Sequence, residues 1–356
     1  MGSWSWWVPP LALGITGASL LMHASGIGFL LICVAALISA VVAAVHHAEV
    51  VAHRIGEPLG TVVLSIAVTI IEVSLLVTVM LANDPGKAAL PRDAIFAVIM
   101  LSLNGLVGLS MLIGALRHHE QEFHVIGANA SLATLIALSS LTLVLPGFTV
   151  TSPGLTYSPA QLAFASLVSL MLWASFIFVQ TVRHRDYFLP VTDWANENSH
   201  APRPAFGRAL ASAGMLLLSL TAVVGLAHEI SPGIERGVIA AHAPKPVVSI
   251  AIALLTLLPE GAAAVRAASA DRLQTSLNLA TGSAIASIGL TIPAVALCST
   301  LLHLPLVLGL ESKELVLLML TFFIASITLV AGRTHVLLGV VHLVILAAFL
   351  FFSVLP

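Results

Sequence analysis

The sequence predicts an all-α integral membrane protein with about eleven transmembrane helices, an extra first helix followed by two inverted five-helix repeats. Three observations predict this fold class. Hydrophobic residues make up 59% of the 356 residues and charged residues only 8%, whereas a soluble domain carries about 25% charged residues. Apolar runs long enough to cross a bilayer recur along the whole chain. One such run in each half of the chain carries a glutamate near its middle.

Each predicted helix is an apolar run that ends at charged residues or at a segment rich in proline and glycine. A helix needs about 20 residues to cross about 30 Å of hydrocarbon. The breaks after residues 23 and 331 are short, so ten or twelve spans are alternatives to eleven. The eleven predicted spans are residues 7–23, 27–46, 59–82, 93–116, 124–146, 160–183, 207–228, 246–267, 275–303, 312–331 and 335–355.

The order of the spans predicts four parts of the chain. They are an extra transmembrane helix (1–26), a first repeat (27–183), a cytoplasmic loop (184–206) and a second repeat (207–356). Of the 14 Lys and Arg residues, nine lie in loops on the side of the N-terminus, which leaves 14 − 9 = 5 on the other side. Because cytoplasmic loops are enriched in Lys and Arg, we expect a cytoplasmic N-terminus and an external C-terminus. The five residues of the poorer side are Lys87, Arg92, Arg236, Lys245 and Lys313.

Several functional classes are disfavoured by the sequence. The formal net charge of −2 predicts no nucleic-acid partner. The chain lacks a P-loop, and the run "HEISP" (228–232) lacks the second histidine of a zinc metalloprotease motif. We therefore expect a protein that is not an enzyme and needs no cofactor. Its expected partners are the lipid bilayer and the solutes that it binds, and an assembly of identical chains is left open.

Two acids lie inside apolar spans, at similar local settings. Glu72 lies in "TVVLSIAVTIIEVSLLVTVMLA" (61–82), and Glu260 lies in "PVVSIAIALLTLLPEGAAAVRA" (246–267). Thr69 and Thr256 precede these acids by three and four residues, so each shares a helical face with its acid. A charge at the middle of a membrane costs about 2.5–3.5 kcal/mol on insertion scales. A functional role is the expected reason for keeping two such acids.

The positions of the two acids predict the inverted repeat. Glu72 lies in the third predicted span and Glu260 in the eighth, five spans later. Because five is odd, the two halves cross the membrane in opposite directions. Inverted repeats place a substrate site near the bilayer midplane, where the repeats meet. We therefore expect Glu72 and Glu260 to converge there.

Two converging carboxyl groups can bind either protons or a cation. Burial and a second acid raise the pKa of a carboxyl group, which then holds a proton when no cation is present. Oxygen-rich sites of this kind suit Ca²⁺. Competition for one pair of acids gives antiport of two protons against one Ca²⁺. The predicted ion- and proton-binding residues are Glu72 and Glu260, which also hold the metal, with Thr69, Thr256, Asn104, Ser283 and Ser287 as further oxygen donors.

The alternative for the five polar donors is ordinary packing between helices, where Ser, Thr and Asn are common. A passive cation channel, with the acids as a ring of charge, is a more remote alternative for the whole chain. Histidines near the predicted cytoplasmic side offer a further function. His46, His47 and His53 are candidates for pH sensing, because histidine titrates near pH 6.5. Their alternative is that of solvated residues at the membrane interface.

Both acid-containing segments resemble the calcium/cation antiporter superfamily, in its calcium/proton exchanger (CAX-type) branch and nearest to bacterial ChaA-type antiporters. The segments are "HHAEVVAHRIGEPLGTVVLSIAVTIIEVSLL" (46–76) and "LLPEGAAAVRAASADRLQTSLNLATGSAIASIGLTIPAV" (257–295). The resemblance implies an inverted-repeat antiporter that exchanges Ca²⁺, or Na⁺ and K⁺, for protons by alternating access. It also implies a bacterial inner (plasma) membrane location.

The resemblance also bears on the site residues. The conserved family acids match Glu72 and Glu260, and the family's polar ligands match Ser283, Ser287 and Asn104. Gly108 and Ser287 depart from the sodium/calcium branch, which has carboxamide or carboxylate groups there. The run "VTIIE" replaces the "GNATE"-like run of many calcium/proton exchangers. The expected exchange is Ca²⁺ against H⁺, and Na⁺(K⁺)/H⁺ antiport on the same fold is the alternative.

Overall fold

The computed structural model describes residues 4–22, 26–56, 59–81, 88–189, 204–240, 244 and 246–355. Most of the predicted cytoplasmic loop, residues 190–203, lies outside this described part, as do Lys87 and Lys245. The chain forms two compact units, which we describe separately. Unit 1 contains residues 1–87 and 201–248, and unit 2 contains residues 88–200 and 249–356.

The predicted fold class is confirmed. Ten helical spans of the described chain are long and apolar enough to cross a membrane. Helix α1 (Trp4–Met22) adds a further apolar helix of 19 residues. The predicted repeat boundaries and the direction of the spans remain predictions, because each compact unit takes segments from both halves of the chain.

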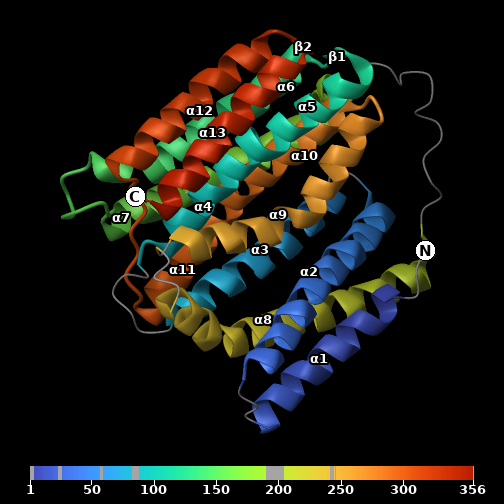
Figure 1. Cartoon of the computed structure of the whole chain (residues 1–356), viewed down its shortest axis with the longest axis vertical. Helices are drawn as coiled ribbons and strands as arrows, with labels where there is room; N and C mark the ends of the chain where they lie inside the picture. The colour runs from blue at the N-terminus through green and yellow to red at the C-terminus, as the bar shows by residue number, and fades with distance from the viewer. Residues whose placement is uncertain are drawn as a thin grey trace. The chain divides into compact units, whose positions relative to one another are not determined.

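Unit 1 is built mainly from four helices: α1, α2 (Ile27–Ile55), α3 (Leu59–Leu81) and α8 (Phe206–Ala240). Helix α2 packs along α8, α1 and α3 (Figure 1). Small residues allow close packing, since a Cβ added at Gly225 of α8 would lie 2.3 Å from Cγ2 of Thr16 in α1. A half-buried acid joins the same two helices, because Ser19 Oγ donates a hydrogen bond of 2.5 Å to Glu229 Oε2.

Helix α2 is longer than the sequence predicted. The predicted span ended at residue 46, whereas the helix continues to Ile55. His47 is only 1% exposed. Its Nε2 lies 2.8 Å from the Ser5 carbonyl oxygen of α1. Its ring also packs edge-on against Trp6, with ring centroids 5.3 Å apart. Contacts with α1 therefore satisfy a polar residue that local hydropathy treats as the end of a span.

Two spans of unit 2 change helix type in the middle. The first combines α4 (Leu90–Met100), the π-helical segment η2 (Leu101–Leu106) and α5 (Val107–His118). The second combines α10 (Leu273–Ala286), the π-helical segment η7 (Ser287–Thr291) and α11 (Ile292–Leu302). η2 packs against α10, and η7 packs against α4. π-Turns inside helices are frequent at functional sites, which makes this crossing a place of interest.

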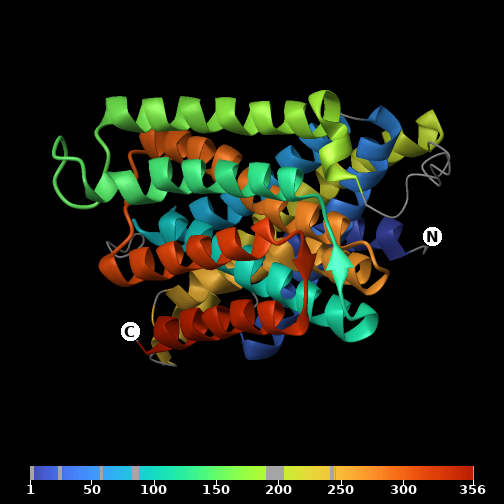
Figure 2. The same cartoon turned by 90° about the horizontal axis from the view of Figure 1, so that it is seen from above.

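The other helices of unit 2 surround these two spans. Helices α6, α7, α12 and α13 run alongside one another in Figure 2. Ser158 begins α7 with a capping box, in which its hydroxyl accepts from the Gln161 amide and the Gln161 side chain accepts from the Ser158 amide. The remaining elements are α6 (Val125–Ser139), η3 (Ser140–Val144), η4 (Leu145–Gly147), α7 (Pro159–Phe178), η5 (Val179–Arg183), η6 (Arg185–Phe188), α9 (Pro246–Ser269), α12 (Ser312–Val330) and α13 (Val336–Val354).

A two-residue strand pair joins the turn before α6 to the turn before α13. β1 (Gln121–Glu122) pairs antiparallel with β2 (Arg333–Thr334), and the two lie side by side at one end of the unit (Figure 1). Arg333 Nη2 adds an ion pair of 2.9 Å to Glu122 Oε1. The pairing holds two helix connections together at this end.

Candidate ion-binding site

Glu72 lies near the middle of α3 in unit 1, where the sequence predicted a buried acid. Glu72 is 1% exposed, and so is its neighbour Ile71. Thr69, predicted as a further oxygen donor, is half-buried on the same helix. A carboxyl group with this little exposure needs a compensating charge or a proton.

Glu260 lies on α9 in unit 2 and is half-buried. Pro259 precedes it, yet α9 continues as one helix from Pro246 to Ser269. The next residue, Gly261, contacts η2, because a Cβ added there would lie 2.9 Å from Cδ2 of Leu106. A side chain at position 261 would require the Leu106 side chain to move.

The predicted donor Thr256 lies on α9 and is 4% exposed. Its hydroxyl donates within the helix, to the carbonyl oxygens of Ile252 at 3.3 Å and Ala253 at 3.1 Å. The hydroxyl oxygen of Thr256 still has lone pairs, so its geometry is compatible with binding a cation. Glu72 and Glu260 belong to different compact units, and their convergence remains a prediction.

Ser283 and Ser287 lie on the second interrupted span of unit 2. Ser283 is half-buried in α10, and Ser287 is 5% exposed at the first position of η7. The backbone amide of Ser287 reaches the carbonyl oxygens of both Ala284 and Ser283. Ser276, on the same helix, donates a hydrogen bond of 2.7 Å to Ser110 of α5. The polar residues of α10 therefore lie on a span that is fixed to α5.

Asn104 is fully buried in η2, and the structure gives both ends of its carboxamide a protein partner. Its Nδ2 donates to Thr321 Oγ1 at 2.9 Å, and its Oδ1 lies 3.1 Å from Nδ1 of His342. His342 was not among the predicted site residues. It is a polar residue inside the apolar run 335–355, so the rule that singled out Glu72 would also have found it.

Gly108, one of the departures from the sodium/calcium branch, has a packing role in unit 2. A Cβ added at Gly108 would lie 2.8 Å from Cβ of His342 and 3.2 Å from the Gly339 carbonyl oxygen. One added at Gly339 would lie 2.6 Å from the Leu112 amide nitrogen. The backbones of α5 and α13 meet at these glycines. A carboxamide side chain at position 108 would not fit in this arrangement.

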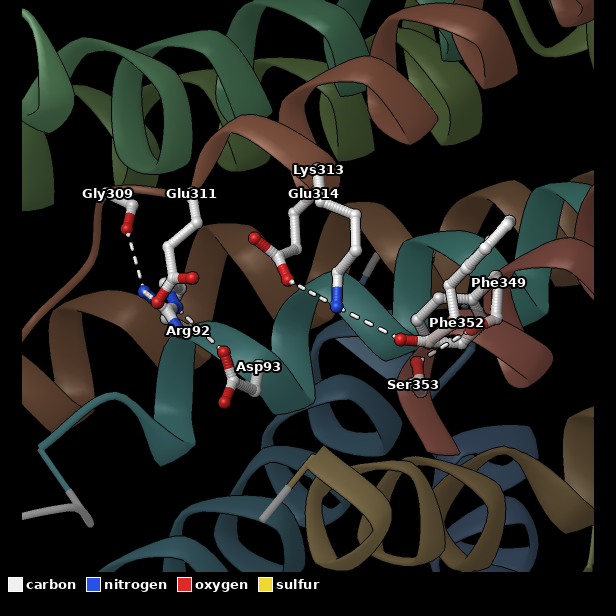
Figure 3. A network of polar contacts seen from close by, with 9 residues as sticks. All are labelled: Arg92, Asp93, Gly309, Glu311, Lys313, Glu314, Phe349, Phe352 and Ser353. Atoms are coloured by element: carbon white, nitrogen blue, oxygen red, sulfur yellow. Dashed lines mark hydrogen bonds and ion pairs between the residues drawn. The ribbon is translucent and has the colours of Figure 1, made fainter. Parts of the chain in front are cut away.

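A second polar cluster lies where α4 and α12 begin, and Figure 3 shows it from close by. Arg92 is 6% exposed. Its Nε donates to Asp93 Oδ1 at 2.7 Å and its Nη1 donates to the Gly309 carbonyl oxygen at 3.1 Å. Glu311 Oε1 lies 3.7 Å from Nη1 of Arg92. Arg92 therefore ties the start of α4 to the segment that leads into α12.

Lys313 extends this cluster to the end of α13. Its Nζ donates to the Phe352 carbonyl oxygen at 3.0 Å and lies 3.7 Å from Glu314 Oε1 (Figure 3). A cation at the C-terminal end of a helix is favoured by the helix dipole. The cluster joins three helix ends of unit 2 and was not predicted from the sequence.

The three histidines proposed for pH sensing differ in their surroundings. His46 is half-buried and packs against Trp4, with ring centroids 5.7 Å apart. His47 is buried against α1, as described above, and His53 is exposed near the end of α2. Only His53 has the exposure expected of a solvated residue, and pH sensing remains a prediction for all three.

Comparisons with known proteins identify the family of the chain. The family described as "Sodium/calcium exchanger protein" matches residues 25–182 and 211–355. A putative ionic transporter, y4hA of Sinorhizobium fredii, is 43% identical over 99% of this chain and 96% of its own. The sodium-potassium/proton antiporter ChaA of Escherichia coli is 32% identical over 90% of this chain and 87% of its own.

Solved structures share the fold. The crystal structure of the Ca²⁺/H⁺ antiporter protein YfkE matches with a TM-score of 0.74 and 14% identity, over 99% of each chain. The resemblance inferred from the two acid-containing segments is thus confirmed at the level of the family. The chain belongs to the sodium/calcium exchanger protein family of the calcium/cation antiporter superfamily and is a transmembrane cation exchanger.

Proposed function

We propose that the chain is a secondary-active cation/proton antiporter that exchanges Ca²⁺ for H⁺ by alternating access. Protons and the cation compete for Glu72 and Glu260. The observation that carries this proposal is the 1% exposure of Glu72 inside a 23-residue apolar helix. Such an acid is stable there when it is protonated or when it is paired with a positive charge. An antiporter alternates between these two states, with the proton bound in one half of its cycle and the cation bound in the other.

Hydroxyl and carbonyl oxygens complete the proposed site. The proposed oxygen donors beside the acids are Thr69, Thr256, Ser283 and Ser287. Asn104 lies in η2, the segment whose Leu106 contacts the helix of Glu260 at Gly261. Ca²⁺ prefers six to eight oxygen ligands, which two acids alone do not supply. The proposal includes the predicted inverted repeats, which would allow one set of ligands to face each side of the membrane in turn.

A second cation class is supported by a specific comparison. The relative that is 32% identical is named a sodium-potassium/proton antiporter. Monovalent antiport would use the same two acids and the same proton competition. We place Ca²⁺ first because two carboxylates supply a charge of −2, and Na⁺ or K⁺ second. The proposed location is the bacterial inner membrane, with a cytoplasmic N-terminus and an external C-terminus.

The test is transport by the purified protein in liposomes that enclose a pH-sensitive dye. With the lumen acidified, added Ca²⁺ should release protons from the vesicles, and the panel should include Na⁺, K⁺ and Mg²⁺. Cation flux that ignores an imposed proton gradient would contradict antiport and would indicate a channel. A response to Na⁺ or K⁺ with none to Ca²⁺ would reverse the order of the two candidates.

A further inference from the structure

A continuous chain of buried polar groups crosses unit 2 from α12 and α13 to η2. Its members are 0–1% exposed: Met100, Asn104, Thr321, Thr328 and His342. The contacts run from Thr328 Oγ1 to His342 Nε2 at 3.2 Å, from His342 Nδ1 to Asn104 Oδ1 at 3.1 Å, and from Asn104 Nδ2 to Thr321 Oγ1 at 2.9 Å. Thr321 Oγ1 then lies 3.3 Å from Met100 Sδ.

Hydrogen-bond chemistry sets the direction of this chain. The amide oxygen of Asn104 only accepts, so Nδ1 of His342 must carry the proton and donate to it. With a neutral ring, Nε2 is then an acceptor for the Thr328 hydroxyl. At the other end, Thr321 accepts from Asn104 and donates to the sulfur of Met100. The Nδ1–H tautomer of neutral His342 therefore gives every group in the chain a matched partner.

The segment that this chain holds also contacts the helix of Glu260. Asn104 lies within η2, and Leu106, two residues later, contacts α9 at Gly261 beside Glu260. Gly108, two residues further, lies against Cβ of His342, since a Cβ added at Gly108 would lie 2.8 Å from it. His342 thus contacts the η2–α5 segment through its ring at Asn104 and through its Cβ at Gly108. A shift of η2 would be transmitted to α9 through the Leu106–Gly261 contact.

We propose that His342 is a positioning residue for transport. Its neutral ring orients the Asn104 carboxamide and fixes η2 against α9, which sets the position of Glu260. Asn104 supports the cation site as a strut and not as a ligand. The effect on transport rests on the proposed antiport function, whereas the tautomer and the hydrogen-bond chain do not.

Three variants of similar size separate the links of the chain. His342→Asn places an amide donor where Nδ1 was, and His342→Gln places one nearer Thr328. His342→Leu removes both. We expect His342→Asn to keep an apparent KM for the cation close to wild type, and His342→Leu and His342→Gln to raise it about tenfold, since one buried hydrogen bond to a fixed partner is lost. A smaller effect is expected on the maximal rate. Equal KM values for the wild type and His342→Leu would overturn the proposal.

A second pair of variants addresses the other end of Asn104. Thr321→Val removes the acceptor of Nδ2 at constant shape, and Thr321→Ser retains it. We expect Thr321→Val to raise KM like His342→Leu and Thr321→Ser to leave it near wild type. If both variants lower the maximal rate and the yield of folded protein to the same extent, with KM unchanged, Thr321 is structural and the proposal fails.

The tautomer can be measured without any transport assay. Protein labelled with ¹⁵N at histidine should give, in solid-state NMR spectra, one Nδ1–H tautomer signal that disappears in His342→Asn. Its assignment to an Nε2–H ring would overturn the proposal even if antiport is confirmed. If the signal has the expected form but the wild type shows no proton-coupled flux, the proposed function fails and the hydrogen-bond chain stands.

Discussion

Oδ1 of Asn104 and Nδ1 of His342 lie 3.1 Å apart, although 238 residues separate them in the chain. This contact connects the first interrupted span of unit 2 to its last helix. The amide group of Asn104 has protein partners on both sides.

Replacing either membrane-embedded acid with its amide should stop exchange. Glu72→Gln and Glu260→Gln keep the shape of the side chain but cannot release a proton or offer a full negative charge. We expect proton release in response to Ca²⁺ to fall to the level of empty vesicles in each variant. Glu120→Gln is the matched control, because this acid has a side chain that is 64% exposed. Substantial exchange in one acid variant would remove that residue from the mechanism.

The contact of α5 with α13 should not tolerate a methyl group. Gly108→Ala would bring a Cβ to 2.8 Å from Cβ of His342, and such overpacking costs about 1–3 kcal/mol. We expect a lower midpoint of thermal unfolding in detergent. Gly282→Ala is the control, because a Cβ there has nothing within 4 Å, and it should leave the midpoint unchanged or raise it. Equal midpoints for Gly108→Ala and the wild type would show that the helices separate more easily than their packing indicates.

Arg92 should stabilise unit 2 through Asp93. Arg92→Ala leaves Asp93, whose side chain is 15% exposed, without its 2.7 Å partner. Breaking a buried pair from one side costs about 3–5 kcal/mol. Because the cost comes from the abandoned carboxylate, the double variant Arg92→Ala with Asp93→Ala should regain part of the stability lost in Arg92→Ala. Additive effects of the two substitutions on the unfolding midpoint would show that the residues do not interact.

The crossing of α5 with α10 should permit a disulfide. The hydroxyls of Ser110 and Ser276 are 2.7 Å apart, and a disulfide joins two sulfurs at about 2.05 Å. In a chain whose Cys33 and Cys298 are replaced by Ala, we expect Ser110→Cys with Ser276→Cys to crosslink under mild oxidation. Both residues belong to unit 2, so exchange should persist after crosslinking. Loss of flux that reduction restores would show that these helices move relative to each other during transport.

Tyr157 offers a test of the connection between α6 and α7. Burial raises the pKa of its phenol above the ordinary value of 10.0, and its hydroxyl donates to the Leu141 carbonyl oxygen at 2.5 Å. Since the pKa is raised in the folded state, the contribution of the protonated Tyr157 to the free energy of unfolding is fully present below about pH 10. This contribution is lost as the pH rises through the folded pKa. The chain has two tyrosines, so the tyrosinate absorbance of Tyr187→Phe reports Tyr157 alone. A midpoint at or below the pKa of a free tyrosine would place Tyr157 in solvent.

The sequence was sufficient for the spans and for the buried acid of α3. A bilayer-length apolar run favours a helix, and Glu72 stands out because it is the one charged residue of the run 61–82. It was not sufficient for the part of α2 beyond residue 46, where the polar His47 lies against Ser5 of another helix. The partner of Asn104 was also out of reach, because a hydrogen bond between segments far apart in the chain leaves no local pattern.

The π-helical segment η2 also places a constraint on chain length. An α-helix advances by about 100° per residue, and a π-turn takes up one residue more than an α-turn. The extra residue in Leu101–Leu106 therefore sets the rotational phase of α5 relative to α4. Deleting one residue from η2 would turn Gly108 by about 100°, away from Gly339, and would bring a side chain into the helix contact. Substitutions within η2, apart from those at Asn104, are thus expected to be tolerated more readily than any change in its number of residues.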